Sequence, residues 1–228
     1  MILRMYSLSL DPDHPLLFSA DEIRSLLNKK LAEYTRSRGN DTAGFIFRYP
    51  VLQYKQIKTN SLVTGIGQGA DCLCQLTRDQ VTLGAGQNTC RITARDPKIR
   101  HELFGVAATL ITYEFLTPWI ALNQQNAKKF YDLHGKPQRD AFMQKLLIAQ
   151  LNTLAKSLNY DIPIPIICVS KVRFRQERIE RENVMVFLGK FQTNLTIPDY
   201  LGIGQSVSKG YGTIQCIAES SDTYSGES

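Results

Sequence analysis

Long apolar runs and a secretion signal are missing from this sequence of 228 residues. The longest apolar stretches, around Val106–Leu110 and Ile162–Val169, are far shorter than the roughly 18 consecutive apolar residues of a membrane helix. Met1–Tyr6 has no basic segment followed by an apolar segment and a small-residue cleavage site, so it predicts a strand rather than a signal peptide. We therefore expect a cytoplasmic protein without a membrane span.

Paired cysteines are also missing. The five cysteines are odd in number and irregular in spacing, which argues against a secreted disulfide framework. Cys72 and Cys74 form a Cys-x-Cys pair, but no second pair or nearby histidine completes a zinc site. Buried, reduced thiols are the simpler interpretation, and we expect no metal and no cofactor.

Acidic residues are fewer than basic ones: 27 Lys and Arg face 21 Asp and Glu, a net charge of +6. Three of the acids lie in Glu219–Ser228, which has no base and which we expect to be a disordered tail. Without this tail 27 bases face 18 acids, a net charge of +9. A basic body favours a polyanionic partner, although a basic protein without such a partner has the same composition.

The first half of the chain shows a strand, helix, strand, strand, helix, strand pattern. Apolar residues recur at helical intervals after the capping-box spacing of Ser19–Glu22, and aromatic and β-branched residues mark the strands. The predicted elements are a strand over Met1–Leu10, a helix from Ser19 to Tyr34, strands over Phe45–Ile57 and Ser61–Ile66, a helix over Ala70–Leu76, and a strand within Gln80–Ala94.

The second half repeats this plan, with its best helix beginning at Pro137 and carrying one apolar stripe. The other predicted elements are a strand over His101–Leu116, a helix over Asn123–Leu133, an extended Ile162–Val169, a hairpin of Lys171–Arg181 and Val184–Asn194 turning at Glu182-Asn183, and a strand over Thr213–Ala218. We predict an α+β protein of two tandem ferredoxin-like (RRM-like) domains with antiparallel sheets and a C-terminal glycine-rich loop. The domains span residues 1–98 and 99–218, with the junction in Arg95–Phe104 and a tail over 219–228.

The strongest local motif is the glycine-rich segment, residues 202–212, with four glycines, two serines and one lysine. Its backbone can approach a ligand closely, and successive N–H groups can bind anionic oxygens. A Walker loop is excluded because Lys209-Gly210 reverses the required order, and a dinucleotide fold is excluded because only 16 residues follow. A glycine-rich hairpin corner without ligand is the alternative. The candidate RNA-binding residues here are Gly202, Gly204, Ser206, Ser208, Lys209, Gly210, Tyr211 and Gly212.

A second candidate surface is the basic strand, defined by Lys171, Arg173 and Arg175. Their two-residue spacing places the three charges on one face, where they can follow a phosphate backbone. Arg178 lies further along and completes the set of candidate RNA-binding residues. Nearby glutamates dilute this charge, so a solvated, salt-bridged hairpin fits the composition equally well.

Bases and tyrosines alternate in a third stretch, Arg24–Lys58, which holds eight Lys and Arg against two acids. Tyr34, Tyr49 and Tyr54 lie among them. Single-stranded RNA favours this combination, because its bases stack on aromatic rings while its phosphates are neutralised.

Residues 199–214 resemble the C-terminal glycine-rich loop of the sixth CRISPR-associated protein family, the endoribonucleases that process repeat RNA. The other blocks resemble the type I-B branch of that family, in the same order from residue 1 to 217: Phe47–Lys55 with Ile66–Ala70, Pro118–Asn123, and Gly189–Pro198. The resemblance implies two ferredoxin-like domains and metal-independent cleavage of CRISPR repeat RNA, in which the 2′-hydroxyl attacks and leaves a 2′,3′-cyclic phosphate. It also implies CRISPR RNA as partner, other subunits of a type I interference complex, and a homodimer.

One departure concerns the proton-handling histidines, which that branch places just beyond its first helix. Tyr34–Asp41 contains none, and His14, His101 and His134 are isolated. The resemblance therefore assigns the catalytic roles to Tyr34, which would position the 2′-hydroxyl, to Arg36 and Arg38, which would neutralise the transition state, and to Lys55, which would protonate the leaving oxygen. We expect slow cleavage. The rivals are a catalytically inactive subunit that binds repeat RNA and a structural backbone subunit of the same superfamily.

Overall fold

A computed structural model describes most of the chain: residues 1–10, 50–58, 60–78, 82–85, 88–91, 98–179 and 181–217. Between residues 24 and 36 it describes seven residues, all helical, in agreement with the predicted first helix: Arg24, Ser25, Asn28, Lys29, Ala32, Glu33 and Arg36. Several predictions fall outside the described residues, namely the start of the first helix at Ser19, the strand residues 45–49, His14, Tyr34, Arg38 and the tail 219–228.

The first half forms a four-stranded antiparallel sheet in the order β2-β3-β1-β6, the ferredoxin-like order. Its elements are β1 (Ile2–Leu10), β2 (Leu52–Ile57), β3 (Asn60–Ile66), α2 (Gln68–Arg78) and β6 (Lys98–Leu103). The strand predicted within Gln80–Ala94 is wrong as a member of this sheet. That region holds a separate two-stranded hairpin, β4 (Thr82–Ala85) with β5 (Asn88–Arg91), and β6 takes the fourth place.

The second half forms another four-stranded antiparallel sheet, in the order β10-β7-β9-β8. Its elements are β7 (Gly105–Phe115), α3 (Gln124–Asp132), α4 (Lys136–Ser157), β8 (Cys168–Ile179), β9 (Glu182–Thr196) and β10 (Ile214–Cys216). The position of the second ferredoxin helix, between β9 and β10, is taken by the glycine-rich segment with one turn of 3-10 helix, η2 (Val207–Lys209). The predicted α+β class with two ferredoxin-like units is confirmed.

Two predicted strand limits are wrong. The single strand over His101–Leu116 is two strands in different sheets, because the chain passes from β6 to β7 at the fully buried Phe104. The β8–β9 hairpin pairs Ile179 with Glu182 and Arg178 with Asn183, so its turn precedes Glu182 and does not lie at Glu182-Asn183. Arg181 has a positive φ of 74°, which accounts for the tight reversal.

Helix α4 carries the core of the second domain. Met143, Leu147, Leu151 and Leu154 recur every three or four residues and are buried, and Pro137 lies in the first turn, where its missing N–H costs nothing. Of the cysteines whose burial is described, Cys72 and Cys168 are buried as predicted, whereas Cys74 is half-buried and Cys216 is exposed.

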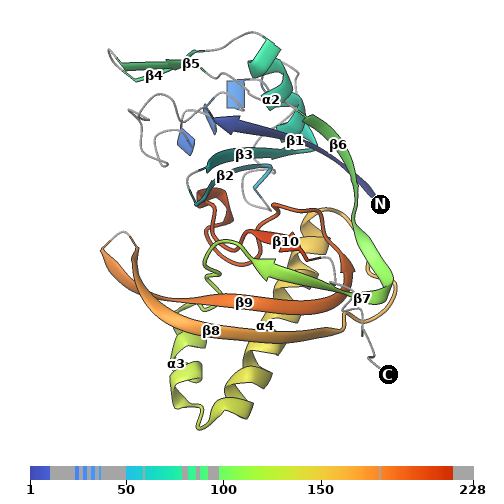
Figure 1. Cartoon of the computed structure of the whole chain (residues 1–228), viewed down its shortest axis with the longest axis vertical. Helices are drawn as coiled ribbons and strands as arrows, with labels where there is room; N and C mark the ends of the chain where they lie inside the picture. The colour runs from blue at the N-terminus through green and yellow to red at the C-terminus, as the bar shows by residue number, and fades with distance from the viewer. Residues whose placement is uncertain are drawn as a thin grey trace, which may run out of the picture.

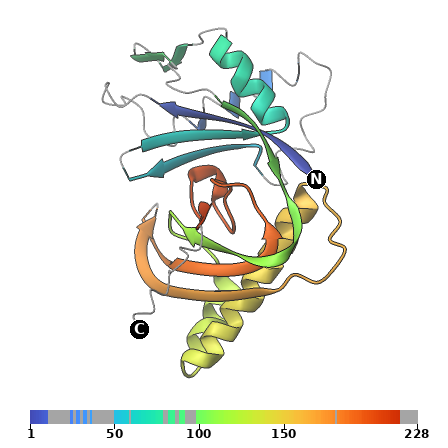
Figure 2. The same ribbon diagram turned by 45° about the vertical axis from the view of Figure 1, so that its right-hand side comes forward.

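The two sheets stand one above the other, with the glycine-rich segment between them (Figures 1 and 2). Helices α3 and α4 cover the far face of the second sheet, and α2 packs on β1 and β3 of the first. None of the helices in the described part of the chain combines the length and the apolar character needed to span a lipid bilayer.

Candidate functional site

The glycine-rich segment is packed into the protein. Gly202, Gly210 and Gly212 are buried, and a side chain at any of them would collide with a neighbour. A Cβ atom at Gly210 would lie 2.7 Å from the carbonyl oxygen of Tyr54 on β2, and one at Gly212 would overlap the carbonyl of Ile203. These glycines let the segment close onto strand β2 and onto itself. Their burial gives them a packing role.

Most backbone N–H groups of this segment have partners inside the protein. Ile203 donates to Gly212, Gln205 to Ile120, and Gly212 to Pro118, at 2.8–3.0 Å. Among the described residues, the N–H groups of Ser206, Val207 and Ser208 have no hydrogen-bond partner. Ser206 is exposed, with Ser208 and Lys209 half-buried beside it. An anion can therefore reach the exposed part of residues 204–209, and Tyr211 beyond them is half-buried.

Lys55 lies in a buried polar network between the first sheet and the glycine-rich segment. Its side chain is fully buried, and its Nζ donates to Gln53 Oε1 at 2.7 Å and to Thr213 Oγ1 at 3.3 Å. Thr213 and Thr117 in turn donate to the carbonyl of Gly210, at 2.9 and 2.6 Å. Burial lowers the pKa of the Lys55 ammonium from 10.5 to about 7. The network ties strand β2 to the glycine-rich segment.

The basic strand is open to solvent. Lys171, Arg173 and Arg175 are exposed on β8 and alternate with Val172 and Phe174. Val172 and Phe174 face helices α3 and α4, so the three charges lie on the face of the second sheet that carries the glycine-rich segment. The predicted common face of these three residues agrees with the structure.

Two neighbouring side chains modify the positive charge of the basic strand. Lys171 stands directly opposite Lys190 on β9, an unfavourable pair of like charges, whereas Arg175 forms an ion pair with Glu177. Arg178 is exposed but points to the opposite face, because it is an odd number of residues from the other three.

The predicted catalytic residues do not gather at one described place. Arg36 is exposed and helical, Lys55 is buried, and Tyr34 and Arg38 lie outside the described residues. His101 lies on β6 and His134 between α3 and α4, so the described histidines sit in different domains. Among the described residues no three His, Cys, Asp or Glu side chains are grouped so that they could hold a metal ion.

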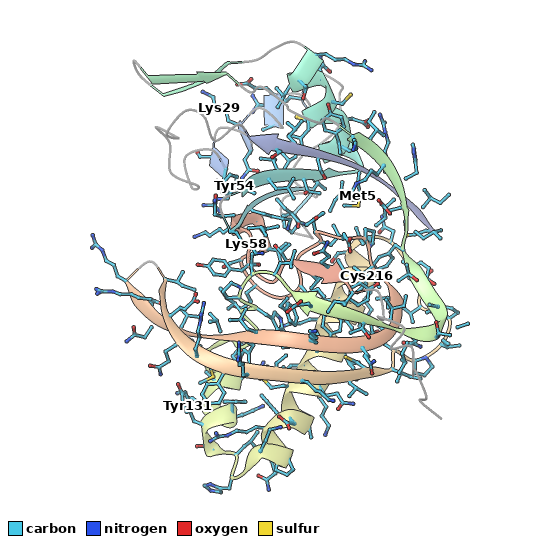
Figure 3. The ribbon with its side chains drawn as sticks, in the orientation of Figure 1. Met5, Lys29, Tyr54, Lys58, Tyr131 and Cys216 are labelled. Atoms are coloured by element: carbon cyan, nitrogen blue, oxygen red, sulfur yellow. The ribbon has the colours of Figure 1, made fainter. Side chains whose placement is uncertain are left out.

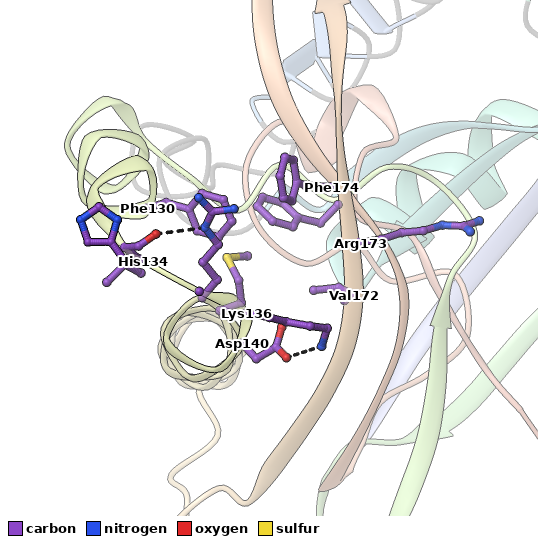
Figure 4. A pocket seen from close by; sticks show the side chains of 12 residues that line it. Phe130, His134, Lys136, Asp140, Val172, Arg173 and Phe174 are labelled. Atoms are coloured by element: carbon purple, nitrogen blue, oxygen red, sulfur yellow. Dashed lines mark hydrogen bonds and ion pairs between the residues drawn. The ribbon is translucent and has the colours of Figure 1, made fainter.

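Sequence reasoning missed two features. The first is the burial of Lys55, which the sequence of its strand does not indicate because polar and apolar residues are mixed there. The second is a cavity between α4 and β8 that contains Arg139 and Phe174 (Figure 4). Arg139 could have indicated this cavity, because it is a charged residue four positions before Met143, on the apolar stripe of α4.

Family models match the whole length of this fold in two parts. The model of the Cas6b N-terminal domain matches residues 1–102, and that of the Cas6b C-terminal domain matches residues 105–217. An uncharacterized protein of Methanocaldococcus jannaschii is 32% identical over 131 residues, which are 54% of this chain and 83% of that protein.

Solved structures agree with these matches. A crystal structure of Cas6b has a TM-score of 0.77 with 26% identity, over 95% of this chain and 100% of that one. A crystal structure of a CRISPR RNA processing endoribonuclease, Cas6b, has a TM-score of 0.73 with the same identity and coverage.

Proposed function

Because the chain belongs to the Cas6b family, we propose that it is an endoribonuclease that cleaves CRISPR repeat RNA within precursor transcripts. The observation that carries this proposal is the match of both Cas6b domain models, in order, over nearly the whole chain. The 26% identity to a Cas6b described as a CRISPR RNA processing endoribonuclease supports the activity.

The proposed reaction uses the RNA as its own nucleophile and needs no metal-bound water. The 2′-oxygen forms a bond to the adjacent phosphorus, the bond from phosphorus to the 5′-oxygen breaks, and the products are a 2′,3′-cyclic phosphate and a 5′-hydroxyl. The 2′-proton must leave and the 5′-oxygen must gain one. In this proposal Tyr34 positions the 2′-hydroxyl, and Arg36 and Arg38 neutralise the negative charge that accumulates on the phosphorane. A guanidinium stays protonated, so neither arginine is the base.

Lys55 acts in this proposal as a positioning residue rather than as the proton donor. Its Nζ has no exposed surface and is engaged by Gln53 and Thr213. An amine in that place cannot touch the scissile phosphate without displacing the glycine-rich segment. By holding Thr213, it sets where the segment lies relative to strand β2.

RNA binding is assigned to the exposed parts of the predicted surface. The basic strand supplies exposed cations, as does Arg178 further along β8, and Ser206, Val207 and Ser208 supply N–H groups, with Lys209 beside them. The basic strand and the glycine-rich segment lie on the side of the second sheet that faces the first sheet, whereas Arg178 points to the other side (Figures 1 and 2). A strand of RNA that crosses this side would contact both.

The test is incubation of the protein with end-labelled repeat RNA in EDTA. A 5′ fragment that ends in a cyclic phosphate is the expected product, and the same RNA with a 2′-deoxy nucleotide at the cut should stay intact. Arg38→Ala should slow cleavage more than it weakens binding, whereas an equal loss in both would move Arg38 to the binding surface. Cleavage that occurs only when a divalent ion is added would contradict the mechanism.

A second function is favoured by one observation, the absence of histidine from Tyr34–Asp41. In this alternative the chain binds repeat RNA and cuts nothing, as a subunit of a CRISPR interference complex. Tight binding with intact RNA, under conditions in which a histidine-containing Cas6b cleaves, would establish it.

A further inference from the structure

A cavity of about 460 Å³ lies between strand β8 and the two helices α3 and α4, on the side of the second sheet away from the glycine-rich segment (Figure 4). The role assigned to the basic strand and the glycine-rich segment does not use it. Its volume is in the range of small-ligand sites. Phe130, Phe174 and Phe187 line its apolar part, and His134, Lys136 and Arg139 its polar part.

One of the three phenylalanine rings that line the cavity is exposed to solvent. Phe130 and Phe187 are at most 2% exposed, whereas Phe174 is 47% exposed. The Phe174 ring meets Phe130 edge-on, with centroids 5.5 Å apart and planes at 85°, and this contact fixes its orientation. A large apolar ring left open beside a cavity is a surface on which another flat ring can stack.

Arg139 provides the donors. Its guanidinium lies over Phe130, 5.3 Å from the ring centroid, and 6.0 Å from the centroid of Phe174. Its Nε donates to the carbonyl of Leu133 at 3.3 Å, and it forms no ion pair with any residue in the described part of the chain. Asp140, which follows it, is paired with Lys136 at the rim. The guanidinium is therefore held in place while its terminal N–H groups remain available.

The cavity is continuous with the basic strand. β8 is the edge strand of its sheet. Arg173 borders the cavity, and its side chain points to the face opposite Phe174 (Figure 4). Tyr131 lies on α3, one of the two helices beside the cavity, and Lys58 directly follows β2 of the first sheet (Figure 3). A nucleic-acid strand that crosses this edge would therefore meet cations on one face and an aromatic cavity on the other.

We propose that the cavity binds one unpaired nucleotide of the RNA, whose base stacks on Phe174 and accepts hydrogen bonds from Arg139; this rests on the proposed RNA-binding function. Lys136 at the rim, with an 85% exposed side chain, contacts the attached phosphate. Arginine offers donors only, so guanine fits best, because its O6 and N7 are adjacent acceptors.

The experiment is a scan of repeat RNA with abasic sites at its unpaired positions, measured by equilibrium binding to the wild type, Phe174→Ala and Arg139→Gln. At one position the abasic site should weaken wild-type binding about tenfold, as expected for loss of a base–aromatic stack. The same abasic site should have no further effect on Phe174→Ala. Phe174→Trp should keep the wild-type response, which separates stacking from a fold defect.

The matched control is Val169→Ala, an exposed apolar residue on β8 on the face away from the cavity. If Phe174→Ala and Arg139→Gln bind every RNA as Val169→Ala does, the proposal is overturned. A cavity that docks a partner polypeptide would give that same negative result.

A second experiment compares the NMR chemical-shift changes that GMP and ribose 5-phosphate cause in the protein. Base-dependent shifts in the wild type that are lost in Phe174→Ala support the cavity even if repeat RNA is not cut. Intact RNA in the cleavage assay would refute the proposed function alone.

Discussion

The glycine-rich segment and the β8–β9 hairpin carry the two strongest sequence signals for RNA binding, yet the protein surrounds them differently. Three of the four glycines in the segment are buried, and most of its N–H groups bond within the protein. In the hairpin Lys171, Arg173 and Arg175 are all exposed. The difference shows that glycines can be selected for close packing as well as for close approach to a ligand. Contact with phosphate then depends mainly on side chains.

The largest effect is expected from Gly212→Ala. The added methyl group would overlap the carbonyl of Ile203, and φ at Gly212 is +64°. We expect a loss of about 3 kcal/mol or more of unfolding free energy, measured by denaturant titration. Gly67→Ala is the matched control, because Gly67 has a similar φ of +54° but open space around it, so it should lose only about 1–2 kcal/mol. Equal losses in both variants would mean that the segment is not tightly packed.

Lys55→Met tests whether the buried lysine, unlike the exposed lysines, makes the stability of the protein depend on pH. In the folded chain the pKa of Lys55 is about 7, whereas in the unfolded chain it is close to 10.5. Below pH 7 both states are protonated and the full penalty of burying the charge applies. As pH rises from 7 to 10.5 the folded amine becomes neutral first, and the wild type gains about 1.4 kcal/mol per pH unit relative to Lys55→Met.

Denaturant unfolding of both proteins at pH 7 and pH 9 measures this change, which should be about 2 kcal/mol in favour of the wild type at the higher pH. The exposed Lys171→Met provides the control and should show no such trend. A constant difference between Lys55→Met and the wild type across this range would place Lys55 in contact with water.

The basic strand should dominate electrostatic binding. Replacement of Lys171, Arg173 and Arg175 by Ala should weaken repeat-RNA affinity about 10- to 100-fold at low salt. It should also reduce the slope of log affinity against log salt by about 2, because each phosphate contact contributes about 0.7 in a single strand. Lys145→Ala with Lys156→Ala, two exposed lysines on α4, is the control. An unchanged slope would assign RNA binding to another surface.

The smallest effect is expected from Glu177→Gln. Glu177 pairs with Arg175 on the basic strand, and an exposed pair of this kind contributes about 0–1 kcal/mol. Its removal frees Arg175 for phosphate, so repeat RNA should bind up to about threefold tighter at low salt, with no difference at high salt. Tighter binding by Glu102→Gln as well, whose partner Arg100 lies on β6, would mean that the gain comes from net charge alone.

The spacing of apolar residues in the sequence predicted most of the fold. The apolar spacing of α4 and the alternation in β8 were visible in the sequence because each element meets the core with one face. The limits of His101–Leu116 were not predicted, because apolar residues on both sides of the change of sheet at Phe104 fit a single continuous strand. Gly105, which has a φ of 149°, is the local mark of that change.

The site was predictable only in part. The common face of Lys171, Arg173 and Arg175 follows from the pleat of a strand. The burial of Lys55 does not, because it depends on Thr213, which is 158 residues away in the chain. The cavity beside Phe174 depends in the same way on where α3 and α4 meet β8.

The position of β8 at the border of its sheet has a consequence for solubility. An edge strand exposes unpaired backbone N–H and C=O groups that can pair with another molecule of the protein, and lysines and arginines on such a strand disfavour that association. The charges that we assign to phosphate recognition therefore also protect the protein from self-assembly. A neutralised hairpin should be checked by light scattering before weaker affinity is ascribed to lost ionic contacts.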